Sequence, residues 1–210
     1  AFIVAGPRIT DVSQTPPIPI GSNYTLAEVG APERYVEVAP QNVRIDWNEV
    51  TKQTVENRLV RGSIRGIKVD ESEKPLSGAV FGLFAEGTTE FLENAAFAVA
   101  ESSEDGSFSF ENIPYGMWLV RELEASEGYV LSDEIFEVRI TGNNVVIELG
   151  NLENKPVTGE LELTKLDIST GKPLPNAGFR IKDAEGNTVV EGYTDEHGIA
   201  RFTLGYGEYT

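Results

Sequence analysis

The sequence contains no cysteine and only one histidine, which excludes several kinds of site at once. Without thiols the chain can form no disulfide, no zinc–thiolate centre and no thiol nucleophile. The single histidine, His197, lies in a segment typical of a hairpin turn, and no serine in a nucleophile-elbow motif accompanies it. A Ser-His-Asp hydrolase is therefore a poor interpretation, and a secreted chain of this composition must gain its durability from something other than disulfides.

Basic residues are also scarce, because 17 lysines and arginines stand against 34 acidic residues and give a net charge of −17. Such a surface repels a nucleic-acid backbone or an anionic membrane, so we expect neither as a partner. We interpret the charge as a source of solubility and mutual repulsion. No segment has the acidic calcium-loop pattern, and we expect no metal and no cofactor.

The sequence shows no signal peptide, no anchor and no apolar run long enough to span a membrane. It begins at Ala1 and stops within a repeating pattern at Thr210, so we interpret it as a piece of a longer protein.

Short apolar runs separated by turn signals such as Asp-Gly and Gly-Asn predict an all-β fold. Six to eight short strands in one unit favour a β-sandwich. The segment 88–96 is compatible with either a short helix or a loop. The expected strands of the best-defined unit are Ile64–Val69, Ala79–Phe84, Phe97–Ala100, Ser107–Phe110, Met117–Leu123, Ile135–Ile140 and Val145–Leu149.

Stretches of the sequence repeat one another with a period somewhat under 100 residues. Residues 56–70 resemble residues 153–167, and residues 24–35 resemble residues 118–129. The repeated polar residues are Asn57 with Asn154, Lys68 with Lys165, and Glu28 with Glu122. The period predicts three units: the C-terminal part of one repeat at 1–59, a complete repeat at 60–157, and the N-terminal part of a further repeat at 158–210.

Three polar residues in each repeat have the strand parity of apolar neighbours, so we expect them to face inward. Lys165 shares its parity with Leu161 and Leu163, and Glu122 shares its parity with Trp118 and Val120. The asparagine that closes the repeat likewise shares the parity of an apolar residue two positions before it. Burying unpaired charges costs several kcal/mol, so the repeat must compensate for them.

Two interpretations of these inward residues remain open. In one, they form a buried Lys–Glu ion pair capped by an Asn hydrogen bond, or the parity assignment is mistaken. In the other, burial lowers the pKa of the lysine and raises that of the glutamate, so that a neutral amine attacks the Asn side chain. A protonated glutamate then donates a hydrogen bond to the Asn carbonyl, ammonia leaves, and an amide forms across the sandwich.

Several motifs together resemble the Cna B-type, or SpaA prealbumin-like, repeats of Gram-positive surface adhesins and pilins. The resemblance covers almost the whole chain, although Ser126 replaces a usual proline and Arg34 a usual glycine. The motifs are Gly62…Lys68-Val69-Asp70, Pro75–Phe81, the Asp-Gly hairpin before Phe108, Glu122–Tyr129 and Glu153–Pro156.

The resemblance implies tandem Ig-like or prealbumin-like β-sandwiches in a secreted, cell-wall-anchored parent. It also implies a self-catalysed isopeptide bond between Lys68 and Asn154, with Glu122 as the catalytic acid and base. Asn143, Asn144 and Asn151 are rival acceptors. The incomplete repeats supply Glu28 and Asn57 on one side and Lys165 on the other, so head-to-tail complementation between two chains is a further hypothesis.

The function that we expect is that of a structural stalk or spacer whose partners are neighbouring repeats, with single-turnover self-cross-linking in place of enzyme activity. The alternative is a ligand-binding adhesin module that recognises a host extracellular-matrix protein or a glycan, for which Phe91, Tyr115 and Tyr206 are candidate contacts. An accessory sandwich attached to a secreted enzyme is a third interpretation, and the sequence offers no active site for it. A sorting signal and a pilin-type lysine motif are not apparent, so nothing in the sequence supports polymerisation into a pilus.

Overall fold

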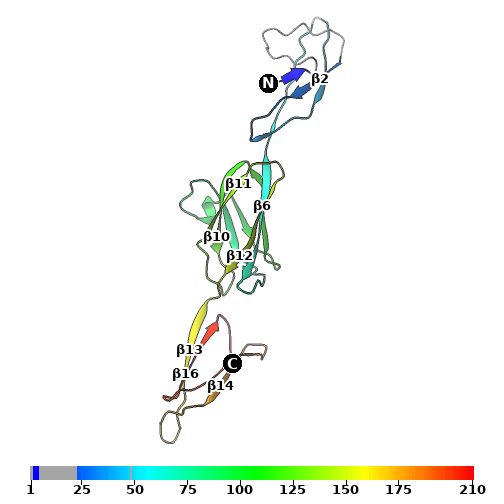
Figure 1. Ribbon diagram of the computed structural model, residues 1–210. Coiled ribbons are helices and arrows are strands. Elements are labelled where there is room, and N and C mark those ends of the chain that lie inside the picture. Colours follow the sequence, from blue (N-terminus) through cyan, green and yellow to red (C-terminus); the bar gives the residue numbers. More distant parts are fainter. Residues whose placement is uncertain (1, 5–22, 48) are drawn as a thin grey trace.

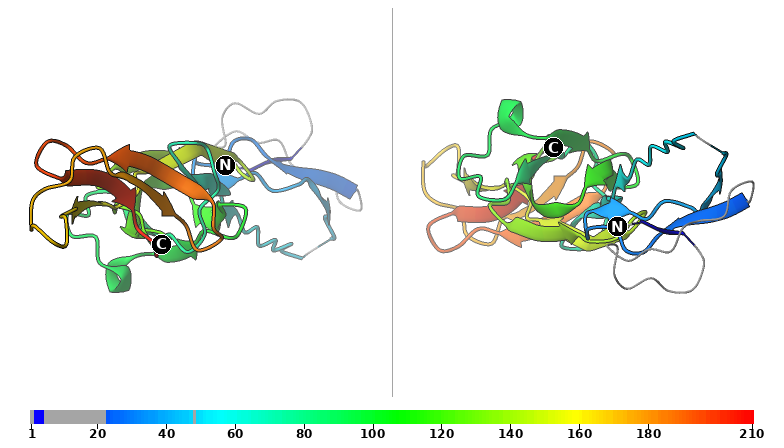
Figure 2. Two further views of the ribbon diagram at one scale, coloured as in Figure 1. Left: turned by 90° about the horizontal axis from the view of Figure 1, so that it is seen from below. Right: turned by 90° about the horizontal axis from the view of Figure 1, so that it is seen from above.

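The structure is a computed structural model, and it describes residues 2–4, 23–47 and 49–210. The strands of these residues fall into three groups, which follow one another end to end in an elongated molecule (Figure 1). Views along the long axis show the groups superposed (Figure 2). We call β1–β5 the first group, β6–β12 the middle group and β13–β16 the third group.

The middle group is a sandwich of two sheets, as the alternating apolar pattern predicts. One sheet has the strand order β11-β10-β7-β8 and the other the order β12-β6-β9. The first and last strands, β6 and β12, lie side by side and pair in parallel. The strands are β6 (Arg61–Asp70), β7 (Val80–Ala85), β8 (Ala98–Glu101), β9 (Ser107–Pro114), β10 (Gly116–Glu124), β11 (Ile135–Ile140) and β12 (Val146–Asn154).

All seven strands expected for this unit are present, and the ambiguous segment 88–96 contains a single 3-10 turn, η2 (Glu93–Ala95). The expected strand Val145–Leu149 extends further, to Asn154, because β12 continues along β6 beyond an irregularity in the register. The Asp-Gly hairpin turns at Gly106, whose φ of +77° is a conformation that glycine adopts without strain.

The core of the middle group lies between its two sheets and is formed by buried aliphatic and aromatic side chains. The rings of Phe81 and Phe108 stack with centroids 3.9 Å apart. Gly66, opposite Phe108 in the β6–β9 pair, leaves room for this stack, because a Cβ there would lie 2.6 Å from the Phe108 ring. The aromatic stack therefore lies between the sheet of β6 and that of β10.

The first group has a three-stranded sheet of order β1-β2-β4 and a short pair, β3–β5. Its β2 and β4 match β10 and β11 of the middle group in pairing and direction. The predicted unit 1–59 lies partly outside the described residues. The strands are β1 (Phe2–Val4), β2 (Asn23–Glu28), β3 (Tyr35–Val36), β4 (Gln41–Arg44) and β5 (Arg58–Leu59).

The third group forms two antiparallel pairs, β13–β16 and β14–β15, around a small core that contains Ile181 and Phe202. It repeats details of the middle group: Thr194 Oγ1 donates to Leu174 O, as Ser102 Oγ does to Leu76 O. The strands are β13 (Thr158–Thr164), β14 (Gly178–Lys182), β15 (Thr188–Tyr193) and β16 (Ile199–Gly205).

Candidate cross-linking site

Several polar side chains are buried in the middle group, and they include the three that the strand parity indicates. Lys68 is 1% exposed, Glu122 is 3% exposed and Asn154 is 2% exposed. Lys68 comes from β6 and Asn154 from the end of β12, whereas Glu122 comes from β10 in the facing sheet. The sandwich thus brings together residues that are far apart in the sequence.

The three side chains contact one another directly. Lys68 Nζ donates to Asn154 Oδ1 at 2.6 Å, and Asn154 Nδ2 donates to both carboxylate oxygens of Glu122, at 2.9 and 3.1 Å. Lys68 Nζ also lies 3.5 Å from Glu122 Oε1. One carboxylate oxygen is therefore within reach of both the amine nitrogen and the amide nitrogen.

Burial lowers the pKa of Lys68 below its ordinary value, although the negative charge of Glu122 acts in the opposite direction. The neutral form of the amine, which carries the nucleophilic lone pair, is thereby favoured relative to an exposed lysine. The amine is held against the side-chain amide of Asn154, so proximity favours attack.

The structure corrects two details of the expected chemistry. Lys68 and Asn154 lie on neighbouring strands of one sheet, so a bond between them would not cross the sandwich, because β6 and β12 pair directly. The side-chain nitrogen of Asn154, and not its oxygen, faces Glu122. Glu122 therefore lies beside the group that would leave and does not hydrogen-bond the carbonyl.

The rival acceptors lie on the surface of the middle group. Asn143, Asn144 and Asn151 are all exposed, whereas Asn154 is buried. Asn143 Oδ1 accepts a hydrogen bond from the Arg61 backbone. Burial and the hydrogen bond from Lys68 Nζ both favour Asn154 as the partner of Lys68.

A backbone contact that the side-chain pattern does not reveal also holds Glu122. The N–H of Ser132 donates to Glu122 Oε2 at 2.8 Å and so fixes the carboxylate. The only sequence signal for it is the repeat, since Val38 lies ten residues after Glu28 just as Ser132 lies ten after Glu122.

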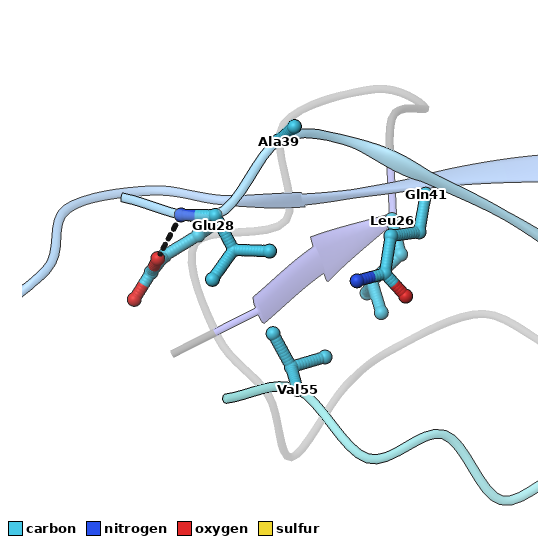
Figure 3. Close-up of a pocket in the computed structure, with 6 residues that line it drawn as sticks. Leu26, Glu28, Ala39, Gln41 and Val55 are labelled. Carbon is cyan, nitrogen blue, oxygen red and sulfur yellow. Dashed lines mark hydrogen bonds between the residues drawn. The ribbon is translucent and has the colours of Figure 1, made fainter. Parts of the chain in front are cut away.

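The first group contains the matching half of this site. Asn57 Nδ2 donates to both oxygens of Glu28 at 2.8 Å, and the N–H of Val38 donates to Glu28 Oε2 at 2.9 Å. These hydrogen bonds, led by that from Val38, lower the pKa of Glu28. Figure 3 shows the Glu28 carboxylate at a small pocket that Leu26 and Val55 also line.

Lys165, the counterpart of Lys68 in the third group, is exposed, contrary to the inward position expected from its parity. Its backbone repeats that of Lys68: Lys165 N–H donates to Gly198 O as Lys68 N–H does to Gly106 O. Parity alone therefore misplaces this side chain.

The remaining residues considered from the sequence are His197 and three aromatic side chains. His197 is exposed in the turn before β16. Phe91 packs edge-on against Phe84, whereas the hydroxyls of Tyr115 and Tyr206 donate to Glu33 and Glu127. The three aromatics considered for ligand contact thus each have a partner within the chain.

Within residues 2–4, 23–47 and 49–210, no cluster of three or more acidic or histidine side chains is arranged to hold a metal ion. None of the helices in this described part is long and apolar enough to cross a membrane.

The two facing sheets of the middle group make this chain an all-β sandwich protein, and comparison with protein families agrees with this fold class. The SpaA prealbumin-like fold domain matches residues 62–154 and 159–210. The chain belongs to this family. None of the curated proteins matches it.

Among solved structures, the chain is similar to the Bacillus anthracis TIE protein, with 34% sequence identity and a TM-score of 0.75. The similarity covers 90% of this chain and 35% of that protein, so the chain spans about a third of its length. The Bacillus cereus major pilin subunit BcpA is more distant, at 20% identity and a TM-score of 0.42, over 67% of this chain and 41% of that one.

Proposed function

We propose that the chain is a stalk segment of a Gram-positive cell-surface adhesin or pilin, outside the cell and attached to the cell wall through its parent protein. Membership of the SpaA prealbumin-like family supports this role, as do the end-to-end strand groups in Figure 1. Its partners are then the neighbouring repeats of the same protein. The observation that carries the proposal furthest is the contact of Lys68, Glu122 and Asn154 in the middle group.

The chemistry proposed for this cluster is a single self-cross-linking event. The neutral Lys68 Nζ attacks Asn154 Cγ, and the new C–N bond forms as the bond from Cγ to Nδ2 breaks. Glu122 accepts a proton from the amine and delivers it to Nδ2, so that ammonia leaves and an uncharged amide remains. The distances of 3.5 Å from Glu122 Oε1 to Nζ and 2.9 Å to Nδ2 suit this transfer.

The position of the bond would suit a stalk under tension. Force on the chain enters the middle group through β6 and leaves through β12, which are parallel neighbours. A covalent link from Lys68 to Asn154 would carry that force directly between the two strands. The residues between them, which contain most of the core, would not be stretched.

Single-molecule pulling on the full chain tests this role. We expect no extension from the segment between Lys68 and Asn154 in the wild type. The Lys68→Ala variant should extend by roughly 300 Å more when its middle group unfolds, because each extended residue spans about 3.5 Å. The same long extension in the wild type would refute the stalk mechanism, and Lys165→Ala, which leaves the buried cluster intact, serves as the matched control.

A second proposal rests on the half-site in the first group. Glu28 and Asn57 have the geometry of Glu122 and Asn154 but no lysine beside them among the described residues, whereas Lys165 is exposed. We propose that the third group of one molecule can complete the first group of another, with a Lys165–Asn57 bond between them. SDS-resistant ladders that grow with protein concentration and vanish in Lys165→Ala are expected. A monomer at all concentrations would refute this proposal and leave the first one standing.

A further inference from the structure

The connection between the first and middle groups is a compact set of hydrogen bonds, which we call the proximal joint. Val60 N–H donates to Arg34 O at 2.8 Å, and Tyr115 N–H donates to Val60 O at 3.0 Å. The Tyr115 hydroxyl, from the turn between β9 and β10, reaches back to Glu33 Oε2 at 3.0 Å. Val36 of the first group also packs against the core of the middle group.

The connection between the middle and third groups, the distal joint, repeats these bonds with different residues. Val157 N–H donates to Gly128 O at 2.8 Å, and Tyr206 N–H donates to Val157 O at 2.9 Å. The Tyr206 hydroxyl reaches back to Glu127 Oε1 at 3.1 Å. Each contact of the proximal joint that involves Val60 or Tyr115 thus has its equivalent here.

The local backbone on the preceding side of each joint is also the same. Tyr35 N–H donates to Pro32 O, and Tyr129 N–H donates to Ser126 O, so both glutamates lie within equivalent turns. Tyr35 pairs with Leu59 in the proximal joint, and Tyr129 forms a bridge with Pro156 in the distal one. Five contacts of each joint therefore recur, although the side chains at several positions differ.

We propose that each repeat carries a docking surface for the next: a glutamate in the turn after its β10-type strand receives the tyrosine of a Tyr-Gly turn from the following repeat. The tyrosine hydroxyl and the backbone bonds at the linking valine hold the two repeats in one relative orientation. The partner of this surface is a following repeat of the same kind, recognised by its tyrosine.

Tyrosine suits this role because its ring is rigid and its hydroxyl donates to a carboxylate, which gives a charge-assisted bond. The hydrogen bond to Glu127 is the main reason that the pKa of Tyr206 lies above its ordinary value. The ring of Tyr206 also lies against Gly128, where a Cβ would come within 3.0 Å of it. In the proximal joint Arg34 occupies the position of Gly128, and the Tyr–Glu bond is nevertheless kept.

The joint serves the proposed stalk function and rests on it, since a spacer that bends freely at every repeat would not hold its tip away from the cell. The relative orientation of two repeats is measured by distances between spin labels. The cross-link in the middle group is measured by the mass of the protein. The proposal about the joints can therefore be refuted while the proposed cross-link stands, and the reverse.

Spin-label distances test the joint in the full chain, which has no native cysteine to interfere. Labels on the exposed positions Thr25→Cys and Glu137→Cys span the proximal joint, and labels on Glu137→Cys and Thr203→Cys span the distal one. The wild type should give one narrow distance distribution across each joint. Tyr115→Phe should broaden the proximal distribution by roughly twofold, because domains with few remaining contacts move relative to one another by default.

Substitutions in one joint should change the distance distribution across that joint alone. Glu33→Gln should broaden the proximal distribution in the same way as Tyr115→Phe, while Tyr206→Phe should broaden only the distal one. Tyr193→Phe, which changes an exposed tyrosine outside both joints, is the matched control. Distributions as narrow as the wild type in both Tyr115→Phe and Tyr206→Phe would overturn the proposal.

A phenol titration gives a second readout that a change in folding alone would not produce. Glu127→Gln should lower the pKa of Tyr206 towards its ordinary value by removing the carboxylate acceptor. An unchanged titration in that variant would show that the Tyr206–Glu127 bond is not made in solution and would also overturn the proposal.

Discussion

The substitution Glu122→Gln should prevent the proposed cross-link in the middle group while preserving the shape of the side chain. Glutamine cannot carry the proton from the Lys68 amine to the leaving nitrogen of Asn154, so the two should remain unlinked. Because Lys68 and Asn154 are 86 positions apart, the proposed cross-link would close a long loop in the unfolded chain. By the chain-entropy argument used for disulfides, a loop of that length contributes about 4–5 kcal/mol to stability.

That loss should appear as a large fall in the melting temperature of the middle group. For a domain of this size each kcal/mol corresponds to several degrees, so we expect a fall of roughly 20–35 °C by differential scanning calorimetry. Glu28→Gln is the matched control, since it alters the equivalent glutamate in a group without a lysine and should leave this transition unchanged. A melting temperature of Glu122→Gln within a few degrees of the wild type would show that Glu122 does not promote a stabilising cross-link.

Three smaller perturbations follow from other parts of the middle group. Ser126→Pro should raise its melting temperature, because the buried Ser126 hydroxyl has no hydrogen-bond partner and Pro32 already occupies the equivalent turn position. Gly66→Ala should lower the free energy of unfolding by about 1–3 kcal/mol in urea titrations, since the added methyl group meets the Phe108 ring. Hydrogen bonds from Ser107 and Ser103 lower the pKa of Asp105 from 3.8 to about 2. The stability that the charged Asp105 carboxylate contributes is therefore present above pH 3.8 and is lost as the pH falls towards 2. Unfolding measured across that pH range should show a smaller acid loss in Asp105→Asn than in the wild type.

Much of the fold could be predicted because its signals are local. Strands such as Ile135–Ile140 are marked by alternation and by flanking turn residues, and their existence does not depend on which strand lies beside them. The inward positions of Lys68, Glu122 and Asn154 could be predicted for the same reason, since parity fixes the face of a strand.

What the sequence could not reveal depends on how strands from different places meet. Parity shows that Lys68 and Asn154 face the core, but it does not show that their strands are neighbours in one sheet. It also places Lys165 inward, although burial requires covering strands that a strand pattern cannot guarantee. The tyrosine–glutamate contacts of the two joints join residues about 80 positions apart, so no local pattern marks them.

The intact mass of the purified wild-type chain, compared with that of Lys68→Ala, shows directly whether the bond between Lys68 and Asn154 has formed. A bond between Lys68 and Asn154 within the chain predicts a wild-type mass that is short by one ammonia, and a Lys68→Ala mass equal to the value calculated from its sequence. The full calculated mass in the wild type would rule out the cross-link, and Lys68, Glu122 and Asn154 would then form only a buried hydrogen-bonded cluster.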